Sequence, residues 1–394
     1  MAMRKHQVVS EKVLESAKRA LEECRPKDAI TALEPLVEYD DEDVDALVYL
    51  GIAYVQAEMP EKAVEVLYRA DELVEQHYVV ELFLGRALWA LGKVTSAEEH
   101  IQEALRLDST QPEPWIDIGR IYLQKREYRQ ALEHLEVAIA KFPDDISAIF
   151  LHALTLYRLG DFTAATKEWA RVHALEPKLM TAVSNYAYVL LLQERSFEAA
   201  PFVGYANTMS SDDYRSLILL GELRFQSGDH EGALECFRKV LDRDPKNIEA
   251  LSRIAVIAHS SRDDKVCREH LSRAEMELGN DPESWRGLCG AYPYLGKWDE
   301  YLDCLIRWTN ADKNAAAPWV TLAKEYDRRG ELEHARNAWR RVFELRGYVK
   351  TRCPSCKTET RLPYSTPSGF DICADKFCET CGSVVYMPAG LPYD

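Results

Sequence analysis

The chain has 394 residues, of which 47% are hydrophobic and 29% are charged, and its formal net charge is −16. This composition is typical of a folded protein and excludes a wholly disordered one. The acidic balance argues against a chain-wide role on nucleic acids or anionic membranes, which favour basic surfaces. Residues 1–12 contain no signal-peptide-like apolar stretch, and no segment approaches a membrane-spanning length of apolar residues. We therefore expect no membrane insertion and a cytoplasmic location.

The ten cysteines form two groups along the chain. Five lie close together near the C-terminus, between Cys353 and Cys381. The other five stand singly, which fits a reducing compartment better than a disulfide framework: Cys24, Cys236, Cys267, Cys289 and Cys304. In such a compartment, clustered cysteine pairs more often hold a metal ion than form disulfides.

In chain order, residues 1–9 carry no repeat signal and are assigned to an N-terminal extension. Residues 10–349 recur with a period of 34 residues, and the clearest unit spans residues 114–143. One half of this unit places apolar residues on a single helical face, and the other half repeats that spacing before a proline. The residues concerned are Trp115, Ile118, Gly119 and Tyr122, then Ala131, Leu135 and Ala138, then Pro143.

Small side chains recur every 34 residues at the positions where two helices must approach closely. The position of Gly119 is Gly, Ala or Cys in all ten units, and the position of Ala131 is alanine in eight of the ten. This pattern resembles the tetratricopeptide repeat (TPR), which reads W-x2-L-G-x2-Y, then A-x3-F, then P. The resemblance implies an all-α, right-handed superhelical solenoid of ten repeats, whose first helices line a concave groove.

Glycines and prolines mark the predicted helix ends. Glycine recurs at the fifteenth position, where the first helix needs a left-handed residue at its C-terminus: Gly92, Gly160, Gly228, Gly296 and Gly330. Pro293 should kink or shorten the first helix of repeat 9. Pro35 and Pro201 should bend their helices without breaking the register of the repeats. We expect the many tryptophans, such as Trp169 and Trp339, to pack in the core.

Nothing in the sequence indicates an enzyme. The 45 residues that follow Val349 are too few for a catalytic domain. The Walker, GxSxG and HExxH motifs are absent from the chain. Cys236, His270 and Cys304 occupy the same position in consecutive repeats, but equivalent helices stand about 10 Å apart or more, too far to share one metal ion.

The C-terminal segment, residues 350–394, carries two CxxC knuckles with the spacing of a four-thiolate zinc site. We predict one structural Zn²⁺ per chain, bound by Cys353, Cys356, Cys378 and Cys381. Zinc binding contributes about 10–16 kcal/mol, which allows a short segment with a small core to fold. Short strands after each knuckle predict a small β zinc ribbon. Two disulfides are the alternative, and Cys373 is left outside the site.

The ribbon has several possible roles. It can act as the cap that a repeat array needs at its end, or as a second protein-binding surface. It carries five basic and five acidic residues, a balance that makes binding to nucleic acid unlikely. The domain order resembles a bacterial family in which a TPR array carries a rubredoxin-like zinc module. Members of that family regulate lipopolysaccharide synthesis by bringing a target to a membrane protease. They have an N-terminal membrane anchor and a glycine where this chain has Lys357. The resemblance implies a non-enzymatic adaptor.

Positions two, five, nine and twelve of each repeat share the face that lines the groove in TPR proteins. This face is apolar and aromatic in repeats 2–7 and polar in repeats 8–10. A peptide or amphipathic helix is expected there, with contacts to Tyr49, Phe83, Arg86, Trp89, Arg120, Tyr157 and Tyr188. Arg86 and Arg120 stand one repeat apart and could clamp an acidic group. The alternative is that positions five and twelve are buried between neighbouring first helices.

The sequence therefore predicts a non-enzymatic scaffold or adaptor that binds protein partners in its groove. Two alternatives stay open: an accessory subunit of a larger enzyme complex, and a regulator that contacts nucleic acid through the ribbon. The carboxylate clamp of chaperone-binding TPR proteins needs Lys at position five and Asn at position nine, and no repeat carries either. Binding to the acidic tail of a chaperone is not expected.

Overall fold

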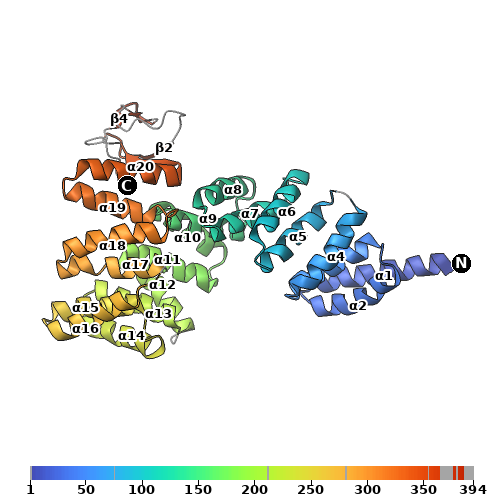
Figure 1. Cartoon of the computed structure of the whole chain (residues 1–394), viewed down its shortest axis with the longest axis horizontal. Helices are drawn as coiled ribbons and strands as arrows, with labels where there is room; N and C mark the ends of the chain where they lie inside the picture. The colour runs from blue at the N-terminus through green and yellow to red at the C-terminus, as the bar shows by residue number, and fades with distance from the viewer. Residues whose placement is uncertain are drawn as a thin grey trace. The chain divides into compact units, whose positions relative to one another are not determined.

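The computed structural model describes residues 2–74, 76–210, 213–279, 282–353, 355–363, 376–378 and 380–385 (Figure 1). These residues divide into two compact units. The N-terminal unit contains residues 1–125 and 133–148, and the C-terminal unit contains residues 126–132 and 149–394. The boundary crosses α8 (Tyr128–Lys141) and the start of α9 (Ile146–Arg158). The sequence predicts one uninterrupted array, so this division is a finding of the structure.

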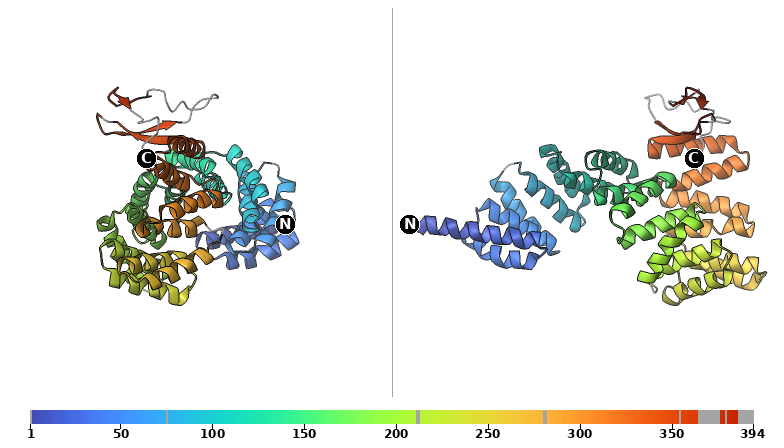
Figure 2. Two further views of the ribbon diagram at one scale, coloured as in Figure 1. Left: turned by 60° about the vertical axis from the view of Figure 1, so that its left-hand side comes forward. Right: turned by 180° about the vertical axis from the view of Figure 1, so that it is seen from behind.

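Both units consist of consecutive helices that pack as antiparallel pairs (Figure 2). The N-terminal unit contains α1 (Ala2–Glu22), α2 (Pro26–Tyr39), α3 (Val44–Gln56), α4 (Pro60–Leu73), α5 (Tyr78–Ala90), α6 (Val94–Leu107) and α7 (Pro112–Gln124). The C-terminal unit contains α10 (Phe162–Leu175), α11 (Met180–Leu192), α12 (Ser196–Met209), α13 (Tyr214–Gln226), α14 (His230–Arg243), α15 (Ile248–Ser260), α16 (Asp264–Met276), α17 (Pro282–Cys289), the 3₁₀ helix η1 (Tyr292–Leu295), α18 (Trp298–Ala311), α19 (Ala317–Arg328) and α20 (Leu332–Arg346).

The helix starts follow the period read from the sequence. Second helices, from α2 to α20, begin every 34 residues, and so do first helices from α3 to α17. The α-helical solenoid is confirmed, whereas the number of TPR units and the domain boundaries stay predictions. Helix α1 begins at Ala2, so residues 2–9 of the predicted extension are helical. Within the described residues, no helix combines the length and apolar composition that a bilayer crossing requires.

Close contacts between the two helices of a repeat explain the small residues at the position of Gly119, which is the eighth of each repeat. A Cβ atom on Gly51 would lie 2.4 Å from a side-chain carbon of Leu67, and one on Gly221 would lie 2.7 Å from the ring of Phe237. Trp169 and Phe237 are fully buried on second helices. The predicted role of large residues in core packing is confirmed at these two positions, and Phe237 fills the space that Gly221 leaves on the facing helix.

Proline has two different effects in the helices. Helix α17 ends at Cys289, and Pro293 lies in the short 3₁₀ helix that follows, as the sequence predicts. Pro35 and Pro201 lie inside α2 and α12, each of which still spans 14 residues. The register of the repeats is therefore kept across all three prolines.

The C-terminal unit closes on itself around Asp161, the residue that caps the N-terminus of α10. Its buried carboxylate accepts hydrogen bonds from the backbone N–H of Ala164 at 3.0 Å and from the hydroxyl of Tyr348 at 2.8 Å. The same carboxylate forms an ion pair with Lys350. Nearby, Nε of the buried Arg346 donates to the carbonyl oxygen of Leu159 at 2.5 Å. These contacts join the α9–α10 turn to the end of α20 and the strand that follows it.

A second set of contacts draws the start of α8 into the same closure. The hydroxyl of Tyr128 donates to a carboxylate oxygen of Asp312 at 2.8 Å, and both side chains are buried. A Cβ atom on Gly160 would lie only 2.7 Å from Cα of Ala317, so the two backbones touch. These contacts explain why residues 126–132 belong to the C-terminal unit. They also hold the helices between α9 and α20 in a closed turn.

Two short antiparallel strand pairs follow α20. Strand β1 (Tyr348–Arg352) pairs with β2 (Glu359–Pro363), with Tyr348 opposite Pro363. Strand β3 (Lys376–Phe377) pairs with β4 (Val384–Val385). Each pair brackets one of the two cysteine knuckles. Cys373 lies outside the described residues, and the zinc ribbon as a domain stays a prediction.

Candidate functional site

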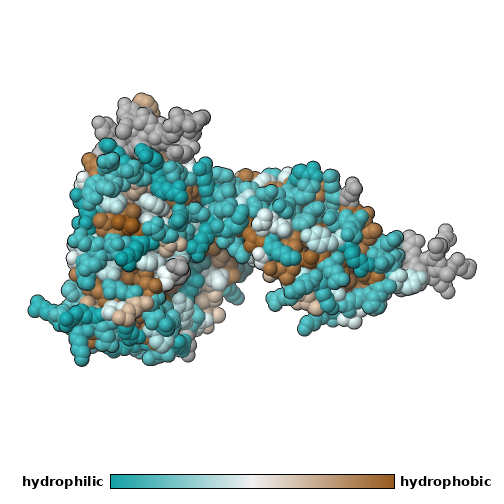
Figure 3. All heavy atoms as spheres, in the orientation of Figure 1, coloured by the Kyte–Doolittle hydropathy of each residue, from teal (hydrophilic) through white to brown (hydrophobic). Residues whose placement is uncertain are grey.

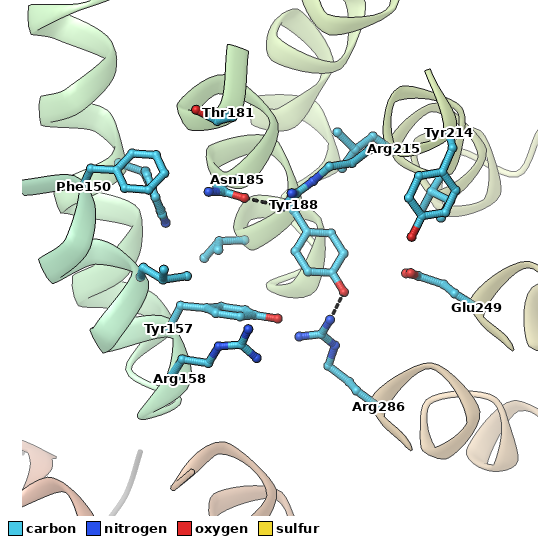
Figure 4. Close-up of a pocket in the computed structure, with 15 residues that line it drawn as sticks. Phe150, Tyr157, Arg158, Thr181, Asn185, Tyr188, Tyr214, Arg215, Glu249 and Arg286 are labelled. Carbon is cyan, nitrogen blue, oxygen red and sulfur yellow. Dashed lines mark hydrogen bonds between the residues drawn. The ribbon is translucent and has the colours of Figure 1, made fainter. Parts of the chain in front are cut away.

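A cavity of about 430 Å³ opens in the C-terminal unit among α9, α11, α13, α15 and α17 (Figure 4). All of these are first helices of their pairs. Its lining includes residues from positions two, five, nine and twelve of the repeat, such as Phe150, Tyr157, Tyr188 and Arg286. The face that the sequence assigned to the groove is thus the face that lines this cavity.

Aromatic rings form one wall of the cavity. Tyr157 on α9 and Tyr188 on α11 are one repeat apart, with ring centroids 6.3 Å from each other. Phe150, which precedes Tyr157 on α9, also lines the cavity. Its ring packs edge-on against the buried ring of Trp169, with the two ring centroids 4.8 Å apart. Because Trp169 is fixed in the core, Phe150 is held in place from behind. The wall is therefore rigid and largely apolar.

Three arginines bring positive charge to the cavity. Arg286 on α17 lies over the rings of Tyr188, at 4.8 Å, and Tyr157, at 5.4 Å, and it donates a hydrogen bond to the Tyr188 hydroxyl. Burial lowers the pKa of the Arg286 guanidinium to about 9. Arg158 lies over the ring of Tyr157 at 5.7 Å, and Arg215 is hydrogen-bonded to the side chain of Asn185. Glu249 is the single carboxylate among the described lining residues.

The structure brings together only two of the seven residues predicted to contact a partner. Tyr157 and Tyr188 both line the cavity. The other five belong to the N-terminal unit: Tyr49, Phe83, Arg86, Trp89 and Arg120. Repeats 2–7 therefore do not contribute to this cavity as one continuous stripe. The sequence placed Arg286 in the polar repeats, beyond the predicted groove, and it missed Arg158 and Arg215 altogether. Arg215 stands at position two of its repeat and Arg286 at position five. These positions belong to the groove-facing set, so they could have indicated both residues.

In the N-terminal unit, the two predicted clamp arginines already hold an acidic group of this chain. Arg86 and Arg120 contact different carboxylate oxygens of Asp117, at 2.5 and 2.9 Å. The Asp117 side chain is only 7% exposed. Arg86 also lies over the ring of Phe83, and Arg120 over that of Trp89. An acidic ligand would have to compete with Asp117 for these arginines.

The surface of the N-terminal unit still exposes apolar side chains between polar ones (Figure 3). Tyr49 and Phe83 are partly buried against its core. The ammonium group of Lys18 lies over the ring of Tyr49 at 4.8 Å. This unit offers apolar surface and cation–π pairs, so the predicted contacts there stay predictions.

Four cysteines gather at the two knuckles and could hold a metal ion. The Sγ atoms of Cys353, Cys356, Cys378 and Cys381 all lie within 4.8 Å of one another. Cys353 and Cys381 are 3.5 Å apart, and Cys356 and Cys378 are 3.6 Å apart. Ligands about 2.3 Å from a tetrahedral zinc ion stand about 3.8 Å from each other, whereas disulfide-bonded sulfurs are about 2.05 Å apart. The spacing fits a metal site and does not fit two disulfides.

The two knuckles share one backbone geometry. The N–H of Cys353 donates to the carbonyl of Thr358, and the N–H of Cys378 donates to that of Ser383, five residues on in both cases. Lys357 and Gly382, which follow the second cysteine of each knuckle, have φ values of 60° and 70°. Lys357 thus adopts the left-handed conformation that a glycine favours at this place.

Hydroxyl groups favour the thiolate form that binds metal. A hydrogen bond with Thr358, at 3.2 Å from Sγ, lowers the pKa of Cys356 to about 6. Ser383 has the same relation to Cys381, at 3.4 Å, and lowers its pKa. Since the thiolate is the metal ligand, both hydroxyls support metal binding.

Two cysteines that the sequence treated as single thiols are paired. Cys289 at the end of α17 and Cys304 in α18 form a disulfide with a Cα–Cα distance of 5.7 Å. Their interpretation as isolated thiols is wrong, because the close approach of the two helices of one pair brings them together. The remaining single cysteines, Cys24, Cys236 and Cys267, are free thiols. Cytoplasmic location stays a prediction.

Three segments of the chain match family models described as tetratricopeptide repeats: residues 14–78, 88–154 and 214–247. These three segments are therefore similar to tetratricopeptide repeats. The lipopolysaccharide-assembly family suggested by the domain order has no support among these matches.

Similarity to curated proteins is distant and partial. The TPR repeat-containing protein YpiA of Bacillus subtilis is 21% identical over 288 residues, which cover 69% of this chain and 64% of that protein. The BBSome complex member BBS4 of Bos taurus is 22% identical, over 63% of this chain and 48% of that protein. The CTR9 homologue of Arabidopsis thaliana is 20% identical, over 61% of this chain and 20% of its own length. The chain thus spans between a fifth and just under two thirds of these relatives.

Solved structures are also similar to parts of the chain. PilF of Pseudomonas aeruginosa is 16% identical, with a TM-score of 0.48, over 53% of this chain and 96% of its own. YrrB, described as a TPR protein with an unusual peptide-binding site, is 19% identical, with a TM-score of 0.40, over 47% of this chain and 96% of its own.

Proposed function

We propose that this TPR-containing chain is a non-enzymatic scaffold that binds a segment of a partner protein in the cavity of its C-terminal unit. One observation carries the proposal: side chains from five successive first helices converge on a single cavity with an aromatic wall. Its volume falls in the range of about 300–1,000 Å³ that ligand pockets occupy. Aromatic and arginine side chains are also the usual anchors of protein interfaces.

The lining supports binding more than catalysis. The described lining residues include no histidine, cysteine or lysine, which most often serve as catalytic bases and nucleophiles. Their polar groups are mainly guanidinium, phenol and amide groups, which donate hydrogen bonds and orient a ligand. Tyr157 and Tyr188 keep the role of partner contacts that the sequence gave them.

The predicted contacts in the N-terminal unit form a second surface in this proposal. Phe83 and Trp89 remain candidates for apolar contacts there. Arg86 and Arg120 remain candidate contacts as well, and an acidic group of the partner would share them with Asp117.

The cysteine cluster completes the proposal. Cys353, Cys356, Cys378 and Cys381 would hold one structural Zn²⁺, for which their separations and the two hydroxyl contacts are suited. The ion would fix the two knuckles to each other. The chain from α20 leads through β1 directly to Cys353, so the module ends the helical array.

Site-specific photo-crosslinking tests the binding surface. We would place the photoreactive residue p-benzoylphenylalanine at Tyr214, which lines the cavity and is 46% exposed, and irradiate the protein in cell extract. One partner protein should cross-link reproducibly at this position. Adding Tyr188→Ala to the same chain should reduce that cross-link at least several-fold, because it removes part of the aromatic wall.

Two further positions serve as controls. Phe197 on α12 is 92% exposed and does not line the cavity, so the same reagent there should not capture the partner. Phe83 tests the N-terminal surface in the same way. Capture of the partner at Phe197 alone, or capture at Tyr214 that Tyr188→Ala leaves unchanged, would contradict the proposed cavity.

A further inference from the structure

The disulfide between Cys289 and Cys304 joins the two helices of repeat 9. Cys289 ends α17, and Cys304 lies in the middle of the facing helix α18. Cys24, Cys236, Cys267 and the four knuckle cysteines are free thiols. The knuckle cysteines can bind metal only as thiolates, so they have to stay reduced. This chain therefore combines one oxidised pair with thiols that must not be oxidised.

The helix pair of repeat 9 does not need this bond in order to pack. Among the described residues Cys289–Cys304 is the one disulfide, and the other helix pairs of the array pack without one. Alanine occupies the position of Cys289 in five repeats: Ala17, Ala153, Ala187, Ala255 and Ala323. Reduction would therefore remove the covalent link and leave a helix pair of the ordinary kind.

A second cavity gives small molecules a route to this disulfide. It has a volume of about 790 Å³ and lies among α16, α17 and α18, and we call it the α16–α18 cavity. Cys304 is among its described lining residues, whereas Cys289 is not. Its lining also includes the exposed side chains of Asp299 and Glu300, so the cavity opens to solvent. A small thiol has room there to reach Sγ of Cys304.

Helix α17 connects the disulfide to the proposed binding cavity, which we call the partner cavity. The helix spans only eight residues, too few to be stable without its neighbours. Arg286, one turn before Cys289, reaches from α17 into the partner cavity (Figure 4). A Cβ atom on Gly287 would lie 3.3 Å from Cα of Glu249 on α15, another lining residue. A change at Cys289 therefore acts on two lining residues, Arg286 and Glu249.

We propose that the Cys289–Cys304 disulfide is a reversible redox switch that controls the partner cavity. A dithiol reductant enters the α16–α18 cavity, and reduction of the disulfide releases α17 from α18. The oxidised chain holds the partner segment, and the reduced chain binds it more weakly because α17 no longer fixes its part of the lining. The effect on the partner rests on the proposed function, whereas the release of α17 does not.

The reaction is a thiol–disulfide exchange in two steps. The thiolate of the reductant attacks Sγ of Cys304, the bond between the two cysteine sulfurs breaks, and Cys289 leaves as a thiolate that takes up a proton. The second thiol of the reductant then attacks the mixed disulfide and releases Cys304, which is also protonated. The protein gains two electrons and two protons, and the reductant ends as its own disulfide.

A monothiol tests the route of attack. The oxidised full chain would be treated briefly with 2-mercaptoethanol, quenched with acid and alkylated with N-ethylmaleimide. Trypsin separates the two cysteines at Lys297, so mass spectrometry reads each one independently. The mercaptoethanol adduct should lie on Cys304 and the maleimide on Cys289. Adducts mainly on Cys289, or no Cys289–Cys304 link in the oxidised chain, would overturn the switch.

Hydrogen–deuterium exchange measures the release of α17 without a partner. Reduction with dithiothreitol should speed amide exchange in α17 at least about 10-fold, since a disulfide of this kind shifts a local equilibrium by that much or more. Cys304→Ala should exchange as fast as the reduced chain, with or without dithiothreitol. Cys236→Ala is the matched control, because Cys236 is a buried free thiol at the same position of its repeat. It should respond to dithiothreitol as wild type does.

The variants keep the test independent of a folding defect and of the knuckles. If Cys304→Ala fails to fold, Cys289→Ala takes its place, because alanine is the residue that five other repeats carry there. An effect of dithiothreitol on α17 that persists in the variant without the disulfide would place the switch at other thiols and overturn the proposal. Equal exchange of α17 in the oxidised and reduced wild type would also overturn it.

Cross-linking at Tyr214 then tests control of the partner cavity. Reduction should lower capture of the partner several-fold in wild type and in Cys236→Ala, and Cys304→Ala should capture little in either state. Faster exchange of α17 with unchanged capture would overturn the control of the cavity but keep the proposed function. Failure to capture a partner in both redox states would contradict the proposed function, and the exchange of α17 would still decide the switch.

Discussion

At the fifteenth position of the repeat, one backbone conformation is imposed on very different side chains. Five repeats have glycine there, as the sequence indicated, and the other five have Cys24, Glu58, Arg126, Glu194 and Arg262. All ten adopt positive φ, between 55° and 83°. The turn between the two helices of a repeat therefore sets this conformation, whichever residue occupies it. A non-glycine residue pays about 1–2 kcal/mol in steric strain for the left-handed conformation.

Arg262→Gly should therefore stabilise the chain. Arg262 is exposed, has φ of 60° and ends the first helix of its repeat, so glycine relieves strain there without removing packing. We expect the free energy of unfolding to rise by about 0.5–1 kcal/mol, because the greater flexibility of glycine in the unfolded chain offsets part of the gain. Urea unfolding followed by circular dichroism measures the change.

The same replacement at a helical position is the matched control. Arg238 is exposed in the middle of α14, where glycine costs about 1 kcal/mol. Arg238→Gly should therefore lower the free energy of unfolding. Equal destabilisation by the two substitutions would mean that the left-handed conformation of Arg262 carries no strain.

At the scale of helices and strands, the closure of the C-terminal unit depends on one N-cap residue. Asp161 caps α10 as Asp263 caps α16, and each accepts from a backbone N–H three residues on, at 3.0 and 3.1 Å. The two residues occupy the same position of the repeat. Asp161 additionally binds Tyr348 and Lys350, and its side chain is fully buried. The contacts of Asp161 with Tyr348 and Lys350 are therefore the ones that close the C-terminal unit.

Asp161→Ala should be much more destabilising than Asp263→Ala. Loss of a cap alone costs about 1 kcal/mol, which is the expectation for Asp263→Ala. Asp161→Ala also leaves Lys350 without its buried partner, and breaking a buried pair costs about 3–5 kcal/mol. Urea titrations of both variants measure the difference. Equal effects would show that the contacts from α20 and β1 add no stability.

The closure should also depend on pH. Burial acts to raise the pKa of Asp161, but the charges of Lys350 and Arg346 outweigh it and hold the pKa below the ordinary value. A carboxyl group with a lowered pKa stabilises the fold above its unfolded pKa of about 3.9, and this stability is lost as pH falls through the folded pKa. The difference in the free energy of unfolding between wild type and Asp161→Asn should be largest at neutral pH and should disappear below about pH 4.

For the whole molecule, the metal centre and the helical array should be separable. Purified protein should contain one zinc ion per chain, and Cys353→Ser should abolish its binding. Each repeat gains stability mainly from its neighbours, so most of the helical signal at 222 nm should remain. Cys24→Ser removes an exposed free thiol between α1 and α2, and this control variant should still bind one zinc ion. Absence of zinc by elemental analysis would contradict the site.

More of the fold than of the candidate site could be predicted from the sequence. The period of 34 residues gave the helix pairs, the fifteenth-position glycines and the shortened helix before Pro293, because each follows from local sequence. The predicted partner contacts stay predictions, and the structure places them in two different units. Tyr157 and Tyr188 line the cavity, but Phe83 and Trp89 lie in another unit. Repeat position shows which face a residue occupies and does not show which distant repeat faces it.

The sequence by itself determined the helical period, the groove-facing positions and the four cysteines of the candidate metal site. These depend on spacing along the chain, which a helix or a knuckle converts directly into geometry. Only the tertiary structure decided that Arg286 meets Tyr188, that Asp161 holds β1, and that Cys289 pairs with Cys304. The first two contacts join residues about a hundred or more positions apart. They depend on the accumulated curvature of many small helix-to-helix rotations, and no single stretch of sequence encodes that sum.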